Sequence, residues 1–486
     1  MTRNSTVDQG HCVKVRIEIT RGPACGQAFE FCEPDRLVFG RALDARISLP
    51  DDPYVSRHHF LLEIAPPHCR VSDLASENGV FVNQVRYGGR TPLPPGAASA
   101  RDRAASTMLV DGDVITVGET ELRVSVAGSG PCAEREGRVP SQRLENMLRE
   151  AIGKRKQDPR FHGYRVIEVL GRGGMGLVYK AEHVSTGRTV AIKTLRPEIA
   201  VVPDAARRFL REASLTQQLK HPNLVQLLES GEENEEFHFV LEFVDGMDLG
   251  RLLQREKPGI GLRRAARLML AILDGMAYAH RARLGVEVQR QDRSVVFGLV
   301  HRDLKPQNIL IDTSKGEWVP KVADFGLAKG FEAAGMTDMT MGGVAGTATY
   351  WPREQLTHYR WLTPASDVFS LGAIFVEMLT GRRARRGFEE IVAAYNRSGR
   401  PLRAADVARA IFSNPIPPLR EARPEIPPSV ADVLDQSVRE AEVSGDPAVM
   451  REQIGRLRFP DAFAFRQALA GALEREGLLG QNEADR

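Results

Sequence analysis

The feature that most constrains the fold is a change in hydrophobic period along the chain. Between Val13 and Ala127, apolar and polar residues alternate over many short stretches, which is the period-two pattern of β-strands. After residue 160 a few strand-like stretches come first, and helical spacing then continues to the C-terminus. Many short strands separated by turns favour a β-sandwich, and strands followed by helices favour a two-lobed α+β unit. The sequence therefore predicts a multidomain chain.

Length and composition agree with this division. The chain has 486 residues, and one domain usually takes about 100–200. Its 66 basic and 63 acidic residues nearly cancel, which argues against a nucleic-acid-binding surface. No apolar run approaches the roughly 18 residues that span a bilayer, and the N-terminus has no signal-peptide pattern. We therefore expect a cytoplasmic protein that neither enters a membrane nor binds nucleic acid.

A segment without either pattern lies between the two regions. Residues 128–160 begin with GSGP and end in the charge-dense GKRKQDPR, with LENMLREAI as a possible short helix between them. This composition is typical of an interdomain linker. The expected division is a first domain over 13–127, a linker over 128–160 and a second domain over 161–475.

A glycine-rich loop opens the second domain. The segment Gly171-Arg-Gly-Gly-Met-Gly-Leu-Val178 lies between two predicted strands. Glycines let backbone N–H groups approach phosphate oxygens that a Cβ would block. Glycine-rich turns are common, so the loop alone is weak support for a nucleotide site. Its flanking strands nevertheless favour a kinase-type loop, because a dinucleotide-binding loop opens directly into a helix.

A lysine follows on the next strand. Lys193 ends the stretch Ala191-Ile-Lys, and a predicted helix carrying Glu212 comes after it. A lone lysine on a strand is usually solvated. A lysine held by a glutamate of the following helix can instead be oriented toward the α and β phosphates of a nucleotide.

Two further stretches complete a set of groups for phosphoryl transfer. They are HRDLKPQN, from His301 to Asn308, and Asp324-Phe-Gly. Transfer of a γ-phosphoryl group needs metal ions, a carboxylate that orients the attacking hydroxyl and a cation near the transferred group. Carboxylate, carboxamide and lysine side chains are all present in these two stretches.

Residues from about Tyr164 to Leu473 resemble a eukaryotic-like protein kinase of the type found in bacteria. The resemblance implies an N-lobe over about 161–241, a C-lobe over about 245–475, and ATP with Mg²⁺ as cofactors, Mn²⁺ being the alternative metal. It implies that Asp303 is the catalytic base, that Lys305 contacts the γ-phosphate, and that Asn308 and Asp324 hold the metal. The implied catalytic set is Asp303, Lys305, Lys193 and Glu212, and the implied ATP-binding set is Gly171, Arg172, Gly173, Gly174, Met175, Gly176, Val178, Ala191, Lys193, Glu242, Val244 and Asp248.

The same resemblance indicates the residue class of the substrate. Lys305 within HRDLKPQN and Thr347 in AGTATY are typical of the serine/threonine class, so the resemblance implies a non-specific serine/threonine protein kinase. Arg302 is expected to pair with a phosphate on the activation loop, since a phosphate adds about −1.5 to −2 charge. Thr337 and Thr340 are the alternative candidates for that autophosphorylation site.

Several expectations concern the helical part. The stretch SDVFSLGAIFVEMLTG predicts a buried helix with Ser366 as N-cap and Gly381 after its end. The resemblance implies that Asp367 anchors the catalytic loop. Pro352-Arg353-Glu354 stands where the family usually has Ala-Pro-Glu, and Arg458 is the expected ion-pair partner of Glu354. Residues 284–297 are an insertion, which we interpret as a surface hairpin, with docking as the alternative role.

The first domain resembles a forkhead-associated (FHA) domain, on Gly40-Arg41, Ser56-Arg57-His58-His59 and Asn78-Gly79 at loop ends between predicted strands. The resemblance implies a phosphothreonine reader in which Arg41 and Ser56 contact phosphate, Arg57 lies nearby and Asn78 holds the peptide backbone. His59 is expected to brace the loop. Glu77 stands where a hydroxyl residue is common, and its carboxylate would repel phosphate unless Arg57 neutralises it.

Two functions remain to be compared. The first is a serine/threonine kinase that phosphorylates protein substrates, whose FHA domain binds phosphothreonine segments of the same chain or of other proteins. The second is a catalytically weak kinase fold that acts as a scaffold through the FHA domain. The presence of Lys193, Glu212, Asp303, Asn308 and Asp324 favours the enzyme.

Overall fold

Alternating residues of the first strands determine how the N-terminal domain packs. In the computed structural model, Val15, Ile17 and Ile19 of β1 (Lys14–Arg21) are fully buried, while the residues between them are more exposed. Such alternation buries one face of each sheet against the other. The structure describes residues 14–32, 35–42, 45–74, 76–90, 106–127, 161–173, 176–194, 213–233, 236–287, 293–325, 348–358, 361–388, 393, 404–441 and 447–479.

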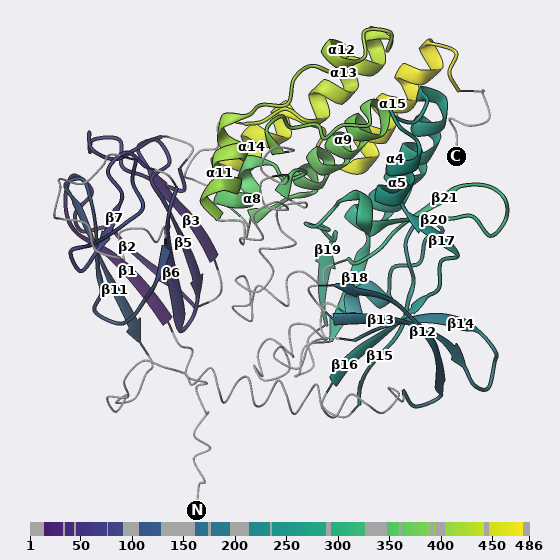
Figure 1. The fold of residues 1–486 in the computed structure, drawn as a ribbon, viewed down its shortest axis with the longest axis horizontal. Coiled ribbons are helices and arrows are strands. Elements are labelled where there is room, and N and C mark those ends of the chain that lie inside the picture. The colour runs from purple at the N-terminus through teal and green to yellow at the C-terminus, as the bar shows by residue number, and fades with distance from the viewer. Residues whose placement is uncertain are drawn as a thin grey trace, which may run out of the picture.

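The N-terminal domain is the predicted β-sandwich of two sheets (Figure 1). One sheet has the strand order β2-β1-β11-β10-β7-β8 and the other β4-β3-β5-β6-β9. Gly118 joins β10 to β11 with a positive φ of 59°, as expected for the predicted hairpin. The remaining strands are β2 (Ala28–Phe31), β3 (Asp35–Gly40), β4 (Ile47–Ser48), β5 (Phe60–Ala65), β6 (His68–Asp73), β7 (Val80–Val82), β8 (Val85–Tyr87), β9 (Ser106–Leu109), β10 (Val114–Val117) and β11 (Thr120–Ala127).

The second domain is two-lobed, also as predicted. Its first lobe contains an antiparallel sheet of order β12-β13-β14-β16-β15, and a smaller sheet, β17-β20-β21, begins the second lobe. The strands are β12 (Tyr164–Gly173), β13 (Gly176–His183), β14 (Thr189–Thr194), β15 (Leu227–Glu233), β16 (Glu236–Glu242), β17 (Gly246–Asp248), β20 (Ile309–Asp312) and β21 (Val319–Val322). The insertion forms the predicted hairpin, β18 (Arg283–Glu287) with β19 (Arg293–Phe297).

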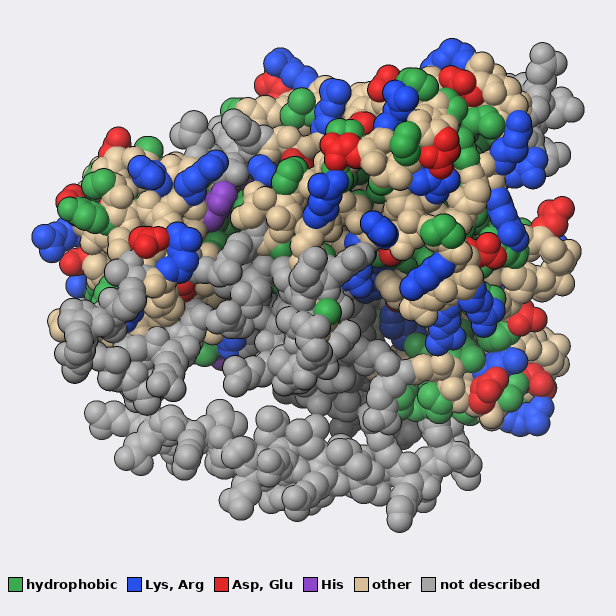
Figure 2. Space-filling model, turned by 45° about the horizontal axis from the view of Figure 1, so that its top comes forward, with side chains coloured by type: hydrophobic (Ala, Val, Ile, Leu, Met, Phe, Trp, Pro, Cys, Tyr) green, Lys and Arg blue, Asp and Glu red, His purple; other side chains and the backbone are tan. Residues whose placement is uncertain are grey.

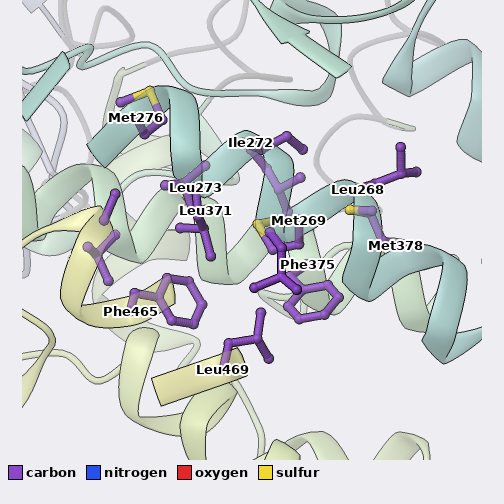
Figure 3. Close-up of a cluster of buried hydrophobic side chains, with 14 of the residues drawn as sticks. Leu268, Met269, Ile272, Leu273, Met276, Leu371, Phe375, Met378, Phe465 and Leu469 are labelled. Carbon is purple, nitrogen blue, oxygen red and sulfur yellow. The ribbon is translucent and has the colours of Figure 1, made fainter. Parts of the chain in front are cut away.

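Helices form the rest of the second lobe around one apolar core. Met269, Leu273, Phe375 and Phe465 of the central helices are completely or almost completely buried there, as Figure 3 shows. The 3₁₀ helix η2 (Pro306–Asn308) lies at the end of the HRDLKPQN stretch. The α-helices are α4 (Leu249–Arg255), α5 (Leu262–Arg281), α8 (Arg353–Thr357), α9 (Pro364–Thr380), α11 (Ala404–Ser413), α12 (Leu419–Ala422), α13 (Pro428–Ser437), α14 (Pro447–Leu457) and α15 (Ala462–Arg475).

The predicted start of α9 is wrong. Ser366 is the third helical residue, and Thr363 is the N-cap, because Pro364 fits the first turn of a helix and its fixed φ starts the helix earlier. Thr363 and Ser366 form a reciprocal capping box. Gly381 ends the helix in a left-handed conformation, with φ 65°, as predicted.

Charges on the described surface are mixed. In Figure 2, lysine and arginine side chains are spread among acidic and apolar ones over both domains, in keeping with the nearly balanced composition. Within the part of the chain that the structure describes, no helix combines the length and hydropathy needed to cross a membrane.

Candidate functional site

The glycine loop forms the tip of a β-hairpin. Gly173 of β12 lies opposite Gly176 of β13, and Gly171 lies opposite Val178. Gly174 and Met175, between the two strands, lie outside the described residues, as does the side chain of Arg172. An added Cβ at Gly171 would meet no heavy atom within 4 Å, so the strand is open at this position.

Lys193 and Asp324 are joined across the two lobes. Lys193 lies in β14 beside β13 and β16, and its Nζ is 2.7 Å from Asp324 Oδ1. Burial opposes the ionised form of Asp324, but the charge and hydrogen bond of Lys193 outweigh it and hold the pKa of this carboxyl below its ordinary value. Glu212, the predicted partner of Lys193, lies outside the described residues.

Asp303 is at the centre of the catalytic loop. Its Oδ2 accepts hydrogen bonds from Lys305 Nζ and from Asn308 Nδ2, each at 3.0 Å. Asn308 Nδ2 also donates to the Asp303 carbonyl at 2.8 Å. These bonds fix the orientation of the Asp303 carboxylate, and a catalytic base must be positioned in this way before it can accept a proton.

Asp367, near the start of α9, holds the loop that carries His301, Arg302 and Asp303. The carboxylate of Asp367 accepts from the backbone N–H groups of His301 at 2.7 Å and Arg302 at 2.9 Å, and from His280 Nε2 at 3.0 Å. Burial raises the pKa of Asp367, but the hydrogen bond and charge of His280 reverse the effect and lower it overall. Arg302 adopts a positive φ of 71°, a strained conformation that these bonds stabilise.

A divalent metal fits the groups that the structure brings together here. The Asn308 carbonyl accepts from Ala323 N at 2.8 Å, which places Asn308 beside Asp324. The carboxamide nitrogen of Asn308 is bonded to Asp303, and its carboxamide oxygen is a hard ligand of the kind that magnesium prefers. Magnesium favours one or two protein oxygens completed by phosphates and water. The described residues contain no group of three or more His, Cys, Asp or Glu side chains that could hold a metal without such help.

The predicted hinge joins the two lobes after β16. The Glu242 backbone N–H donates to Gln226 O at 2.9 Å, and its side chain pairs with Lys321 Nζ at 2.9 Å. Asp248 caps α4, accepting from Arg251 N at 3.0 Å. The N–H and carboxylate of Glu242 and the carboxylate of Asp248 therefore already have structural roles.

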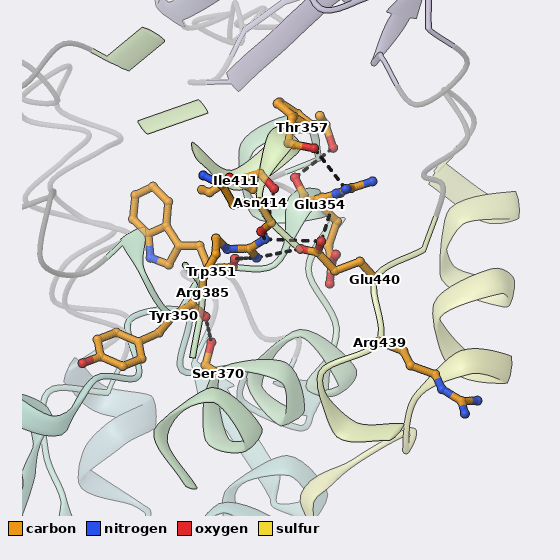
Figure 4. A network of polar contacts seen from close by, with 12 residues as sticks. Tyr350, Trp351, Glu354, Thr357, Ser370, Arg385, Ile411, Asn414, Arg439 and Glu440 are labelled. Carbon is orange, nitrogen blue, oxygen red and sulfur yellow. Dashed lines mark hydrogen bonds and ion pairs between the residues drawn. The ribbon is translucent and has the colours of Figure 1, made fainter. Parts of the chain in front are cut away.

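A second ionic cluster, absent from the sequence predictions, supports α8. Arg385 is fully buried, and its Nη2 lies 2.6 Å from Glu440 Oε1 (Figure 4). Its guanidinium also donates to the carbonyls of Trp351, Ile411 and Asn414. Arg353 Nε lies 3.0 Å from the same carboxylate, so two arginines share Glu440. No local sequence pattern marks this cluster, because its members meet only in the folded chain.

The predicted phosphopeptide residues lie together on the sandwich. Arg41, Ser56, Arg57 and Asn78 line one pocket of about 880 Å³. Ser56 Oγ accepts from Glu77 N at 2.9 Å, and Asn78 Nδ2 donates to Tyr54 O at 3.0 Å. These bonds join the two loops that carry the predicted contacts.

His59 braces this loop pair, as predicted. Its Nδ1 accepts from Ser56 N and its Nε2 donates to Gly79 O, both at 3.0 Å. Acceptance by Nδ1 requires the neutral ring with its proton on Nε2. Burial lowers the pKa of His59 below its ordinary value of 6.5, although the bond to Gly79 opposes this shift.

Glu77 has an ion-pair partner that the sequence does not predict. Glu77 Oε2 pairs with Arg90 Nη2 at 2.7 Å. Arg90 lies just beyond β8, and the backbone bonds from Arg90 N to Ser76 O and Glu77 O bring the two residues together. No local sequence pattern connects Arg90 to Glu77, because the two residues meet only in the folded chain.

The pocket is completed by the second domain. Arg353 of α8 and Ala408, Phe412 and Ser413 of α11 form its other wall. The rings of His58 and Phe412 stack with centroids 3.8 Å apart. The activation-loop threonines, Thr337, Thr340 and Thr347, lie outside the described residues.

Comparisons with known proteins agree with this arrangement. The protein kinase domain matches residues 164–416, and the FHA domain matches residues 37–98. The chain is 34% identical over 272 residues to the probable serine/threonine-protein kinase SCO3848 of Streptomyces coelicolor, covering 55% of this chain and 37% of that protein. It is also 34% identical over 277 residues to serine/threonine-protein kinase PknA of Mycobacterium tuberculosis, covering 56% and 55%. It therefore spans from about a third to about half of these relatives.

Among solved structures, the PknI kinase domain of Mycobacterium tuberculosis aligns with 65% of this chain and 98% of its own, at 22% identity and a TM-score of 0.44. The kinase match alone covers more than half of the 486 residues. The chain therefore belongs to the protein kinase family, and it carries an FHA domain ahead of the kinase domain.

Proposed function

We propose that this chain is an ATP-dependent serine/threonine protein kinase that phosphorylates hydroxyl groups of protein substrates. The observation that carries the proposal is the meeting of Lys193, Asp324 and the Asp303 loop at the junction of the two lobes. An ion pair across the lobes beside an oriented carboxylate is what positioning a nucleotide and a hydroxyl requires. The serine/threonine relatives support the substrate class.

In the proposed reaction, the substrate hydroxyl oxygen attacks the γ-phosphorus of ATP while the bond between the γ-phosphorus and the ADP oxygen breaks. Asp303 accepts the hydroxyl proton, and Lys305 and Lys193 stabilise the charge on the phosphates. Gly171, Gly173 and Gly176 cover the phosphates, and Glu242 and Val244 offer backbone groups to the base. Mg²⁺, or Mn²⁺ in its place, held by Asn308 and Asp324, would neutralise phosphate charge when bound.

The FHA domain is proposed to read phosphothreonine. Arg41, Ser56, Arg57 and Asn78 converge on one pocket, and a guanidinium with a hydroxyl suits a phosphate. The ligand is a segment of this chain, with Thr337 and Thr340 as candidates, or of another protein. We retain the division into 13–127, 128–160 and 161–475 and a cytoplasmic location as part of this proposal.

One experiment separates an enzyme from a scaffold. ADP formation is measured with Mg²⁺, ATP and a generic protein substrate, using the full chain and Asp303→Asn. The proposal expects turnover by the wild type and at least about 10²-fold less by the variant. Binding of phosphothreonine peptides by a wild type without turnover would instead support a scaffold.

A further inference from the structure

The FHA recognition loops face the kinase domain as well as solvent. The pocket lined by Arg41, Ser56 and Arg57 has Arg353, Phe412 and Ser413 of the kinase domain on its opposite side. Residues from both domains therefore surround the space where a bound phosphopeptide would lie.

The FHA wall and the kinase wall of the pocket are held together by an apolar interface between the two domains. Val38 of β3 and Leu61 of β5 pair across the strands and point away from the sandwich core, yet only 1% and 3% of their surfaces are exposed. They pack in one apolar cluster with Leu356 of α8 and Ile411 of α11. Strand β3 contacts α8, and β6 contacts α11. In Figure 1, α8 and α11 are the helices next to the β3 side of the sandwich.

The charge of the pocket points to an anionic occupant. Glu77, the one carboxylate among its described lining residues, is already neutralised by Arg90. Arg41 and Arg57 then contribute positive charge from the sandwich. On the kinase wall, Arg353 and Arg385 share the single carboxylate of Glu440, which leaves one positive charge in excess. Arg353 Nη2 also donates to the Phe412 carbonyl at 3.1 Å, which holds the guanidinium at the pocket wall without neutralising it.

We propose that the phosphothreonine site is composite and that the kinase domain supplies Arg353 as a binding residue. A phosphothreonine segment would contact Arg41 and Ser56 with its phosphate, and Arg353 would interact with the phosphate or with an acidic neighbour. The inference rests on the proposed role of the FHA domain as a phosphothreonine reader. It assigns a function to the arginine that departs from the usual Ala-Pro-Glu pattern.

Because Arg353 stands where the family usually has proline, Arg353→Pro is a substitution that the fold should accept. Arg353 is the first helical residue of α8, where proline is well accepted because the N–H has no partner within the helix. Pro352 has φ −72° and ψ 164°, which is the conformation required before a proline. Arg353→Pro therefore restores the usual family residue while it removes the guanidinium. Arg353→Met is a second variant that keeps the apolar stem.

The test uses the full-length chain with Asp303→Asn, so that the chain does not phosphorylate itself. The probe is a fluorescent phosphothreonine peptide selected from a degenerate library with this chain, and its unphosphorylated form is the control. Arg353→Pro and Arg353→Met are each expected to weaken binding roughly tenfold, the scale of a lost hydrogen bond to a charged group. The matched control is Arg456→Ala, an exposed arginine of α14, which should leave affinity unchanged. Thermal melting verifies that each variant is folded.

The outcomes separate this inference from the proposed reader role. If Arg41→Ala abolishes binding but both Arg353 variants bind like the parent, the FHA domain reads the peptide alone and the composite site is wrong. If Arg41→Ala has no effect, the reader role itself fails. To identify the source of the ligand, peptide affinity is compared before and after ATP treatment of the chain that retains Asp303. If ATP treatment lowers the affinity and the double variant Thr337→Ala, Thr340→Ala prevents this fall, the ligand is a segment of this chain. If ATP treatment leaves the affinity unchanged, the ligand belongs to another protein.

Discussion

Glu354 and Arg458 form an ion pair in which neither side chain is exposed to solvent. Arg458 Nη1 lies 2.5 Å from Glu354 Oε1, and Nη2 donates to Oε2 at 3.2 Å. The pair joins α8 to the turn between α14 and α15, 104 residues later. Since α8 also carries Arg353, this pair stabilises the helix that forms the kinase wall of the phosphopeptide pocket.

Breaking this pair should be costly. Arg458→Met leaves the Glu354 carboxylate buried without its partner, so we expect a loss of about 3–5 kcal/mol in stability of the C-lobe. Tryptophan fluorescence during urea unfolding measures it, because all three tryptophans, Trp318, Trp351 and Trp361, lie in this lobe. Arg456→Ala removes an exposed pair two residues away and should change stability by less than about 0.5 kcal/mol. Equal effects of the two variants would contradict the account.

Removing Lys193 should affect catalysis far more than stability. Lys193→Met deletes the charge 2.7 Å from Asp324, and we expect phosphoryl transfer to fall about 10²-fold or more. The pKa of Asp324 should rise, because burial then acts with less opposition. Lys220→Met, at an exposed lysine, is the control and should retain full activity. A Lys193→Met chain that transfers phosphate at the wild-type rate would remove this lysine from the mechanism.

Asp367 should make stability sensitive to acid. Its pKa is lowered in the folded chain, so the unfolded chain binds its proton first as the pH falls. The stabilisation is complete above the ordinary pKa of about 3.9 and is lost as the pH falls through the lower folded value. The difference in melting temperature between wild type and Asp367→Asn should therefore be largest near neutral pH and should shrink below about pH 4. A difference independent of pH would show that Asp367 is not ionised in the fold.

Protonation of His59 should loosen the phosphopeptide loops. Its folded pKa lies below 6.5, so the stabilisation it gives is present above that value and decreases as the pH falls through it. We expect phosphopeptide affinity to fall more steeply below about pH 6.5 in the wild type than in His59→Gln. The comparison cancels the titration of the phosphate itself. Parallel pH profiles would rule out this role of the ring.

A charged side chain placed in the apolar interface between the FHA and kinase domains should separate them. Leu61→Asp places a carboxylate in the apolar cluster with Leu356 and Ile411, which is costly without a partner. Small-angle scattering should then give a larger radius of gyration for the full chain. Met108→Asp is the matched control, because Met108 is 46% exposed on β9 of the same sheet. An unchanged radius in Leu61→Asp would contradict the observed contact.

Much of this architecture could be predicted from local patterns. Alternation predicts the sandwich, and Gly118 predicts the β10–β11 hairpin, because both depend on neighbouring residues. Asp303, Asn308 and Asp324 could be identified because their chemistry requires fixed spacings within short segments. Local reasoning placed the N-cap of α9 at Ser366 and overlooked the stronger constraint of Pro364.

The remainder depends on contacts between distant residues. Glu440 pairs with Arg353 and Arg385, which lie 87 and 55 positions away in the sequence, and no periodic pattern relates them. The outward-facing Val38 and Leu61 look like ordinary strand residues until α8 and α11 cover them. For the same reason, the sequence could not indicate that the kinase domain completes the FHA pocket.

The central claim is that this chain transfers phosphate from ATP to serine or threonine through Asp303. It is tested most directly by phosphoamino-acid analysis of a generic protein substrate after incubation with γ-labelled ATP, Mg²⁺ and either the full wild-type chain or Asp303→Asn. The account predicts labelled phosphoserine or phosphothreonine with the wild type and at least about 10²-fold less label with the variant. Label on tyrosine, or equal labelling by both chains, would contradict it.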